Sequence, residues 1–161
     1  MIGNKYIVIV LVAIIAILLV GIGLTFNNQK AEEIEYTDIY ISNASTLTVP
    51  LSNESQNSTD GYGIKFYNDP KYNLNITSFN SEEEPALSGA VQMAAIRDNT
   101  QLGCKPVNVN GTTIYENSTT GVYSVFDGND TTHDNFLIVS NDKNLVVQTY
   151  NSIKYATSSG V

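Results

Sequence analysis

The chain has 161 residues, 16 of them acidic and eight basic, and a formal net charge of −8. This acidic balance repels phosphate backbones, so it excludes the nucleic-acid-binding classes that depend on basic surfaces. Cys104 is the only cysteine, so no intramolecular disulfide can form and the domain must fold on its apolar core.

The first predicted element is a transmembrane helix over residues 6–26, which read YIVIVLVAIIAILLVGIGLTF and carry no charge. At 1.5 Å per residue this segment spans about 30 Å, the thickness of the hydrocarbon core of a bilayer. It contains no ionisable group and no Gly-x-x-x-Gly pattern, so we expect a lipid-facing anchor without a role in ion transport or helix pairing. The lipid bilayer is therefore the first partner that the sequence predicts.

Residues 1–5 form the predicted cytoplasmic end, because Lys5 and the amino terminus precede the helix and cations favour the inner side. Residues 27–33 form a short polar tether. A cleaved signal peptide is the alternative, but its apolar region is usually shorter and the bulky Leu24-Thr25-Phe26 is unlike a cleavage site. We expect a single-pass protein of the cell membrane, with its amino terminus in the cytoplasm and its carboxyl-terminal domain outside.

Residues 34–155 are predicted to form one extracytoplasmic α+β domain, followed by a frayed tail at 156–161. The many tyrosines, β-branched residues and turn formers point to strands. Pro50 interrupts the alternation of Leu47, Val49 and Leu51, which predicts an edge strand there. The first half should contain strands at residues 34–41, 47–51, 62–67 and 74–79, with a polar surface loop over 52–61.

One helix is predicted after the fourth strand. Pro85 suits its first turn, and Glu82, Glu83 and Glu84 favour the positive end of its dipole. Helical spacing assigns four residues to its buried face, and the helix should end between residues 97 and 100. These four residues are Leu87, Ala90, Val91 and Ala94, whereas Met93 and Ile96 lie off that face.

The carboxyl-terminal third is predicted to be strand-rich. Asn110-Gly111 has the chemistry of a type I′ turn, so Val109 should face Thr112 in a hairpin of residues 107–109 and 112–115. A further strand covers residues 122–126. A second hairpin joins residues 136–140 to 145–150, and these strands are apolar on both faces, which places them centrally. The order of elements predicts a mostly antiparallel sheet with one helix packed on a face.

The loop DGNDTTHDN, residues 127–135, is the one candidate for metal chemistry. Oxygen-rich loops can bind Ca²⁺, although this spacing does not fit an EF-hand and a solvated strand connection explains it equally well. His133 is the only histidine, so any histidine-dependent mechanism must use it, and no nucleophile motif accompanies it. We assign no catalytic residue and no cofactor. The candidate Ca²⁺ ligands are Asp127, Asn129, Asp130 and Asp134.

Seven Asn-x-Ser/Thr sequons occur in the sequence. In an exported chain such sequons can carry glycans when they lie in surface loops. Asn53, Asn57 and Asn129 fall in predicted loops and are the glycosylation candidates.

The phrases GYGIKFYND, VNVNGTTIYEN and THDNFLIVSNDKNLVVQTY, together with the apolar amino-terminal segment, resemble small membrane-anchored surface proteins of methanogenic archaea. The layout of residues 46–155 is also loosely similar to PsbP-like α+β domains, which implies an antiparallel sheet packed against helices. No functional residue is carried over from either resemblance.

We therefore expect an anchored extracytoplasmic binding or interaction domain with no catalytic activity, whose partner is an envelope protein, a polymer or a small ligand. The alternative is a structural cell-surface subunit of the pilin-like kind, since such chains also begin with a long apolar helix. The polar, strand-like residues 27–41 argue against a helix that continues beyond the membrane.

Overall fold

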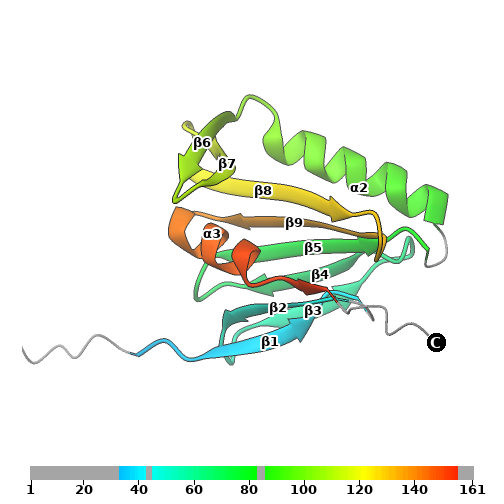
Figure 1. The fold of residues 1–161 in the computed structure, drawn as a ribbon, viewed down its shortest axis with the longest axis horizontal. Coiled ribbons are helices and arrows are strands. Elements are labelled where there is room, and N and C mark those ends of the chain that lie inside the picture. The colour runs from blue at the N-terminus through cyan, green and yellow to red at the C-terminus, as the bar shows by residue number, and fades with distance from the viewer. Residues whose placement is uncertain (1–32, 43–44, 83–85, 156–161) are drawn as a thin grey trace, which may run out of the picture. The chain divides into compact units, whose positions relative to one another are not determined.

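The computed structural model of the protein describes residues 33–42, 45–82 and 86–155. These residues form an α+β domain of antiparallel strands and two helices, which confirms the fold class at this level (Figure 1). The predicted cytoplasmic end, the transmembrane helix, nearly all of the tether and the tail lie outside the described residues. Within the described part, no helix has the length and apolar character needed to cross a bilayer.

The strands form two sheets. The smaller has three strands in the order β1-β2-β10, where β1 is Tyr36–Tyr40, β2 is Ser45–Pro50 and β10 is Lys154–Tyr155. The larger has seven strands in the order β3-β4-β5-β9-β8-β7-β6, and every pairing in both sheets is antiparallel. The strands of the larger sheet are β3 (Gln56–Thr59), β4 (Lys65–Asp69), β5 (Leu74–Asn80), β6 (Lys105–Val109), β7 (Thr112–Asn117), β8 (Val122–Asn129) and β9 (Asp134–Ser140).

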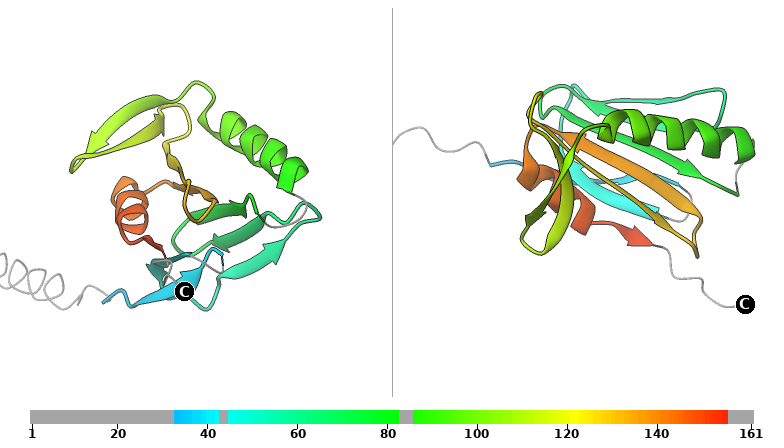
Figure 2. Two further views of the ribbon diagram at one scale, coloured as in Figure 1. Left: turned by 45° about the vertical axis from the view of Figure 1, so that its right-hand side comes forward. Right: turned by 90° about the horizontal axis from the view of Figure 1, so that it is seen from above.

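The seven-stranded sheet has a hydrophobic core on each face. Phe136 and Ile138 of β9 belong to one core, which also includes residues of β2 and of helix α3 (Lys143–Asn151). Leu137, the residue between them, belongs to the other core, which includes Met93 of helix α2 (Ala86–Gln101). Successive side chains of a strand point to opposite faces, so α2 and α3 cover opposite sides of the sheet (Figure 2).

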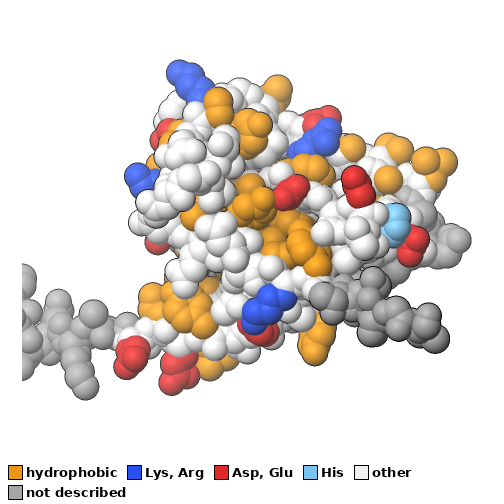
Figure 3. Space-filling model, viewed as in Figure 1, with side chains coloured by type: hydrophobic (Ala, Val, Ile, Leu, Met, Phe, Trp, Pro, Cys, Tyr) orange, Lys and Arg blue, Asp and Glu red, His pale blue; other side chains and the backbone are white. Residues whose placement is uncertain are grey.

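Helix α2 has the predicted position but buries a different face. Leu87 and Val91, predicted to be buried, are 82% and 64% exposed, and Figure 3 shows hydrophobic side chains protruding over this helix. Met93 is 2% exposed and packs on the sheet instead. Gly89 lies one turn before Met93, and its missing side chain lets the helix approach the ring of Phe79 closely. Pro85, Glu83 and Glu84 lie outside the described residues.

The prediction of a strand at residues 145–150 is wrong, because this segment is part of α3. The Asp142 side chain accepts hydrogen bonds from the backbone N–H groups of Asn144, at 2.8 Å, and Leu145, and this N-cap starts a helix where a hairpin turn was expected. In the sequence, the consecutive apolar residues 145–147 are typical of a strand that is buried on both faces. Here they pack a short helix between the two sheets: the buried residues are Leu145, Val146, Val147 and Thr149.

Two further predictions in the first half fail. Strand β2 is the central strand of its sheet, not an edge, because Pro50 is its last residue and β10 pairs only with Ser45 and Thr46 at the other end. A missing N–H at the end of a strand removes no internal hydrogen bond. Part of the predicted loop 52–61 is strand β3, whose four residues are all exposed and need no apolar side chain to pair with β4.

The hairpin of β6 and β7 confirms the prediction in detail. Val109 pairs with Thr112 and Val107 with Ile114, as the sequence indicates. Asn110 and Gly111 have φ values of 51° and 89°, the positive values that a type I′ turn requires. The placement of residues 136–140 at the centre of the sheet is also confirmed, since β9 is the fourth of its seven strands.

We expect Gly89→Ala to destabilise the domain. The new Cβ would lie 2.1 Å from Cε2 of Phe79 and 2.7 Å from the carbonyl oxygen of Tyr62, so the helix must move away from the sheet. Overpacking of this kind costs about 1–3 kcal/mol, more than the helix propensity that alanine gains. The measurement is the free energy of unfolding of the full-length protein in urea.

Gly61→Ala is the control for this experiment, because a Cβ at Gly61 would meet no atom within 4 Å. Its free energy of unfolding should stay within about 0.5 kcal/mol of the wild type. An alanine at position 89 that leaves stability unchanged would contradict the close packing of α2 on the sheet.

Candidate functional site

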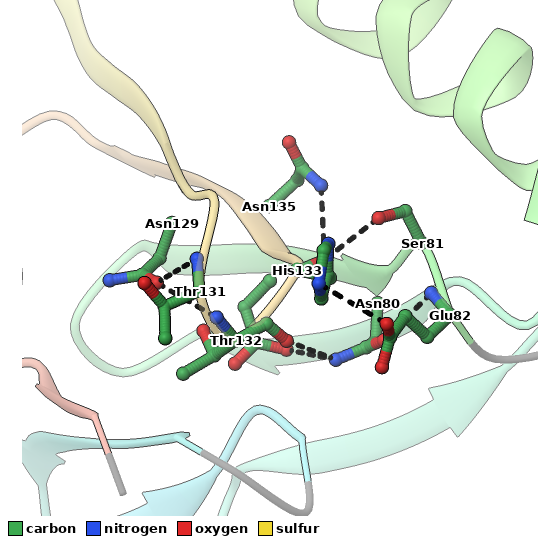
Figure 4. Close-up of polar contacts among 9 residues, drawn as sticks. Asn80, Ser81, Glu82, Asn129, Thr131, Thr132, His133 and Asn135 are labelled. Atoms are coloured by element: carbon green, nitrogen blue, oxygen red, sulfur yellow. Dashed lines mark hydrogen bonds and ion pairs between the residues drawn. The ribbon is translucent and has the colours of Figure 1, made fainter. Parts of the chain in front are cut away.

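The predicted Ca²⁺ loop is the turn between β8 and β9. Asn129 pairs with Asp134 across it, so the candidate ligands lie on the hairpin itself (Figure 4). The side-chain oxygen of Asn129 accepts hydrogen bonds from the backbone N–H groups of Thr131 and Thr132, both at 2.9 Å. His133 has a φ of 59°, in the left-handed region, and closes the turn. The oxygen of Asn129 is therefore used to hold the turn.

Asp134, another candidate ligand, is a buried residue with three donors around its carboxylate. The residue is 2% exposed. Its Oδ2 accepts hydrogen bonds from the hydroxyl of Ser42, at 2.8 Å, and from that of Ser45, while its Oδ1 accepts one from the amide of Asn80, at 2.8 Å. Ser42 lies in the turn between β1 and β2, Ser45 is the first residue of β2, and Asn80 is the last residue of β5. The carboxylate thus fastens the β8–β9 turn to the small sheet and to β5.

Asp127 faces the carboxyl-terminal tyrosines. The hydroxyl of Tyr150 donates a 2.7 Å hydrogen bond to Oδ2 of Asp127. This bond and, after it, burial raise the pKa of Tyr150 to about 12. Burial, followed by the charges of Asp127 and Asp134, also raises the pKa of Tyr155. Both tyrosines therefore stay protonated at neutral pH, and Tyr150 acts as a hydrogen-bond donor to Asp127.

The four candidate Ca²⁺ ligands do not form a common ligand set. Asp130 is exposed at the turn, whereas the carboxylates of Asp127 and Asp134 are engaged by separate protein donors. Among the residues that the structure describes, no three His, Cys, Asp or Glu side chains converge to hold a metal ion.

His133 is linked to the segment that follows β5. Its Nε2 lies 3.2 Å from Oε1 of Glu82, with the two side chains 41% and 71% exposed. Its carbonyl oxygen accepts a 2.9 Å hydrogen bond from the backbone N–H of Ser81 (Figure 4). An exposed contact of this kind adds little stability. The sequence carries no local signal for this contact, because some fifty residues separate its two sides.

A groove of about 670 Å³ lies between the two sheets, at the side where β1 meets β3 and β4. Residues 38–41 form one wall and residues 57–59 and 65–67 the other, with Ile76 and Ser78 of β5 beneath. This volume lies within the range of ligand-binding sites, about 300–1,000 Å³. The sequence does not reveal the groove, because residues 56–59 read as part of a polar loop.

Two groups of the groove, Asp38 and Tyr67, have shifted pKa values. A hydrogen bond from Thr48 and then one from Lys154, whose Nζ lies 2.9 Å from Oδ2, lower the pKa of Asp38, so it stays ionised. Burial, and after it the charge of Asp69, raises the pKa of Tyr67, so it stays protonated. Both shifts move the pKa further from neutral pH.

The glycosylation candidates have different surroundings. Asn53 and Asn57 are exposed, and Asn57 lines the groove. Asn129 is only partly exposed, and its side chain holds the β8–β9 turn. A glycan is thus more easily accommodated at the first two sites.

Comparison with protein families, with curated proteins and with solved structures finds no match to this chain.

We expect Asp134→Ala to destabilise the domain by about 1–3 kcal/mol, because it removes the acceptor that the buried hydroxyls of Ser42 and Ser45 share. The measurement is thermal or urea unfolding of the full-length protein. Asp130→Ala, on the same turn but exposed, is the matched control and should stay within about 0.5 kcal/mol of the wild type.

The same measurement with millimolar Ca²⁺ separates a structural role from a metal site. The unfolding temperature of the wild type should not depend on Ca²⁺, since the carboxylates are already engaged by protein donors. A rise with Ca²⁺ that Asp134→Ala abolishes would overturn the structural interpretation of this residue.

Proposed function

We propose that the protein is a single-pass, membrane-anchored binding domain outside the cytoplasm, which takes up its partner in the groove between β1 and β3–β4. The groove is the observation that carries this proposal: it has the volume of a ligand site, and its walls come from both sheets. Its lining combines buried apolar residues, Ile41 and Ile76, with polar and charged ones such as Asp38 and Ser78, as ligand sites usually do.

The anchoring half of the proposal rests on the sequence. Residues 6–26 have the length and apolar character of a bilayer-spanning helix, and the short tether 27–33 would hold the domain close to the membrane surface. A groove at the outer face would reach envelope proteins or polymers near the bilayer. The same proposal assigns the domain no cofactor and no catalytic residue.

Membrane topology is tested by cysteine labelling of intact cells. The chain offers a clean background, because Cys104→Ser removes its only thiol and Asp130→Cys adds one at an exposed turn. A membrane-impermeant maleimide should label the double variant before lysis, and the labelled protein should remain in the membrane fraction after alkaline extraction. Labelling that occurs only after lysis would refute the proposed orientation, in which the carboxyl-terminal domain lies outside the cytoplasm. A mature amino terminus near Ala31 would refute the anchor.

Binding in the groove is tested by photocrosslinking in the cells that make the protein. Benzoylphenylalanine placed at Ser58, an exposed groove residue, should give a discrete crosslinked product. The matched control is the same replacement at Thr113, an exposed polar residue of β7. Equal crosslinking at both positions would refute the groove as the binding site, whatever the chemistry of the partner.

A further inference from the structure

Building on the proposed function, we propose that the ligand of the groove is an extended polypeptide strand of another protein, bound by backbone hydrogen bonds to β1 on one side and β3 on the other. The two walls of the groove are the edge strands of the two sheets. A strand seated between them would extend both sheets at once, a two-sided form of β-strand addition.

The backbone of β1 has its open edge on residues that line the groove. The N–H of Leu51 donates to the carbonyl of Glu35 at 2.7 Å, and that of Ile41 donates to the carbonyl of Ser45 at 3.1 Å. Hydrogen-bonded positions alternate in an antiparallel pair, so residues 35, 37, 39 and 41 bond to β2. The N–H and C=O groups of Tyr36, Asp38 and Tyr40 therefore point away from β2, and Asp38 and Tyr40 line the groove.

The same reasoning applies to β3. The N–H of Asp60 donates to the carbonyl of Ile64 at 3.0 Å, so the hydrogen-bonded positions of β3 are Gln56 and Ser58. The backbone groups of Asn57 and Thr59 point away from β4, and both residues line the groove. Each wall thus offers an alternating row of donors and acceptors, the pattern that an extended strand completes.

The other edges of the described sheets are closed to this kind of pairing. β6 is the edge strand at the other end of the seven-stranded sheet from β3. Val109 flanks the two-residue turn and is hydrogen-bonded to β7, so every second residue before it, Val107 and Lys105, is also bonded to β7. Pro106 therefore faces outward and has no N–H, a device by which proteins block sheet edges. β10, the far edge of the small sheet, has only two residues. Within the described residues, the longer edges without a proline are those that line the groove.

The chemistry of the groove also indicates which side chains the strand should carry. Three apolar residues that line the groove, Ile41, Tyr67 and Ile76, are buried, so side chains of one parity should be β-branched or aromatic. The charged residues of the groove are Asp38 and Lys65, which balance each other, and the chain as a whole carries a net charge of −8, so this net charge favours cationic side chains at the other parity. β3 has four residues and β1 five, so a segment of about four to six residues is paired.

The probe is a library of eight-residue peptides in which lysine alternates with valine, isoleucine, threonine or tyrosine. The tightest binder to the full-length protein in detergent is resynthesised with fluorescein, and its affinity is measured by anisotropy. Two further versions carry N-methyl groups on every second backbone amide, either at the lysine positions or at the others. N-methylation removes backbone donors and leaves the side chains in place.

Successive N–H groups of an extended strand point to opposite sides, so a strand paired with both β1 and β3 uses the amides of its odd and of its even positions. Each N-methylated version should therefore bind at least tenfold more weakly than the parent peptide. Weakening by only one version would show pairing with a single edge and overturn the two-sided proposal. Equal binding by all three versions would overturn backbone pairing altogether, while groove crosslinking at position 58 would still support the proposed function. Failure of the whole library to bind also refutes the inference.

Variants of the protein test the two walls separately. Tyr40→Pro and Thr59→Pro each remove one outward N–H and leave the hydrogen bonds to β2 and β4 in place. Each should weaken binding about twofold to tenfold, the effect of one backbone hydrogen bond. Tyr40→Ala and Thr59→Ala are the matched comparisons: they remove the same side chain but keep the N–H, so each should bind the peptide more tightly than the proline variant at its position.

Circular dichroism and thermal unfolding establish that each proline variant is folded, and the N-methylated peptides test the same hydrogen bonds without altering the protein. If the alanine variants lose as much affinity as the proline variants, side chains and not the backbone edges bind the peptide. If the protein self-associates through the groove and the peptide does not compete, a second copy is the occupant. Either result overturns the proposal.

Discussion

Strand β9 is the element on which the rest of the domain depends, because its side chains belong to both hydrophobic cores. Phe136 and Ile138 are fully buried against β2 and α3, and Leu137, 1% exposed, is buried on the opposite face against α2. Each of these side chains contributes about 1.5–3 kcal/mol when it leaves water. A central strand buried on both faces therefore couples the small sheet and the two helices into one folding unit.

Asp134, the first residue of β9, adds a polar constraint at the end of this strand. Its carboxylate is bound by hydroxyls of Ser42 and Ser45, which lie about ninety residues earlier in the chain. A buried carboxylate needs such donors, since an unpaired charge in the interior is costly. The position of the small sheet, and with it the position of β1 along the groove, is thus set partly by one carboxylate. A loop whose sequence also offered a weak Ca²⁺ candidate thus supplies a carboxylate that holds two parts of the fold together.

The sequence predicts those parts of the fold whose signal is local. Asn110-Gly111 determines a turn and the register of its hairpin, and the double-sided apolar run at 136–138 indicates a central strand. The sequence does not predict a structure correctly where local residue preferences allow two alternatives, such as two buried faces of a helix, and a contact made elsewhere in the fold stabilises one of them. Helix α2 has apolar residues on two faces, and the contact of Gly89 with Phe79 decides which one is buried. In α3, the cap at Asp142 decides between helix and strand.

The groove illustrates the same limit for the candidate site. Hydrophobic patterning cannot reveal β3, because Gln56, Asn57, Ser58 and Thr59 are all polar and exposed, and only their pairing with β4 makes them a strand. The meeting of β3 with β1 depends on how two sheets pack, which no local pattern encodes.

The polarity of β3 has a physical consequence for how an open edge can persist. A long, flat and apolar edge strand promotes aggregation, whereas a short polar one offers backbone groups without a hydrophobic surface. Recognition at such an edge must come mainly from backbone pairing, with the apolar floor of the groove selecting the side chains that point inward. Asn57 is also a sequon on this edge, so a glycan there would occupy the space that a bound strand needs. The proposed strand binding therefore requires a groove in which Asn57 carries no glycan.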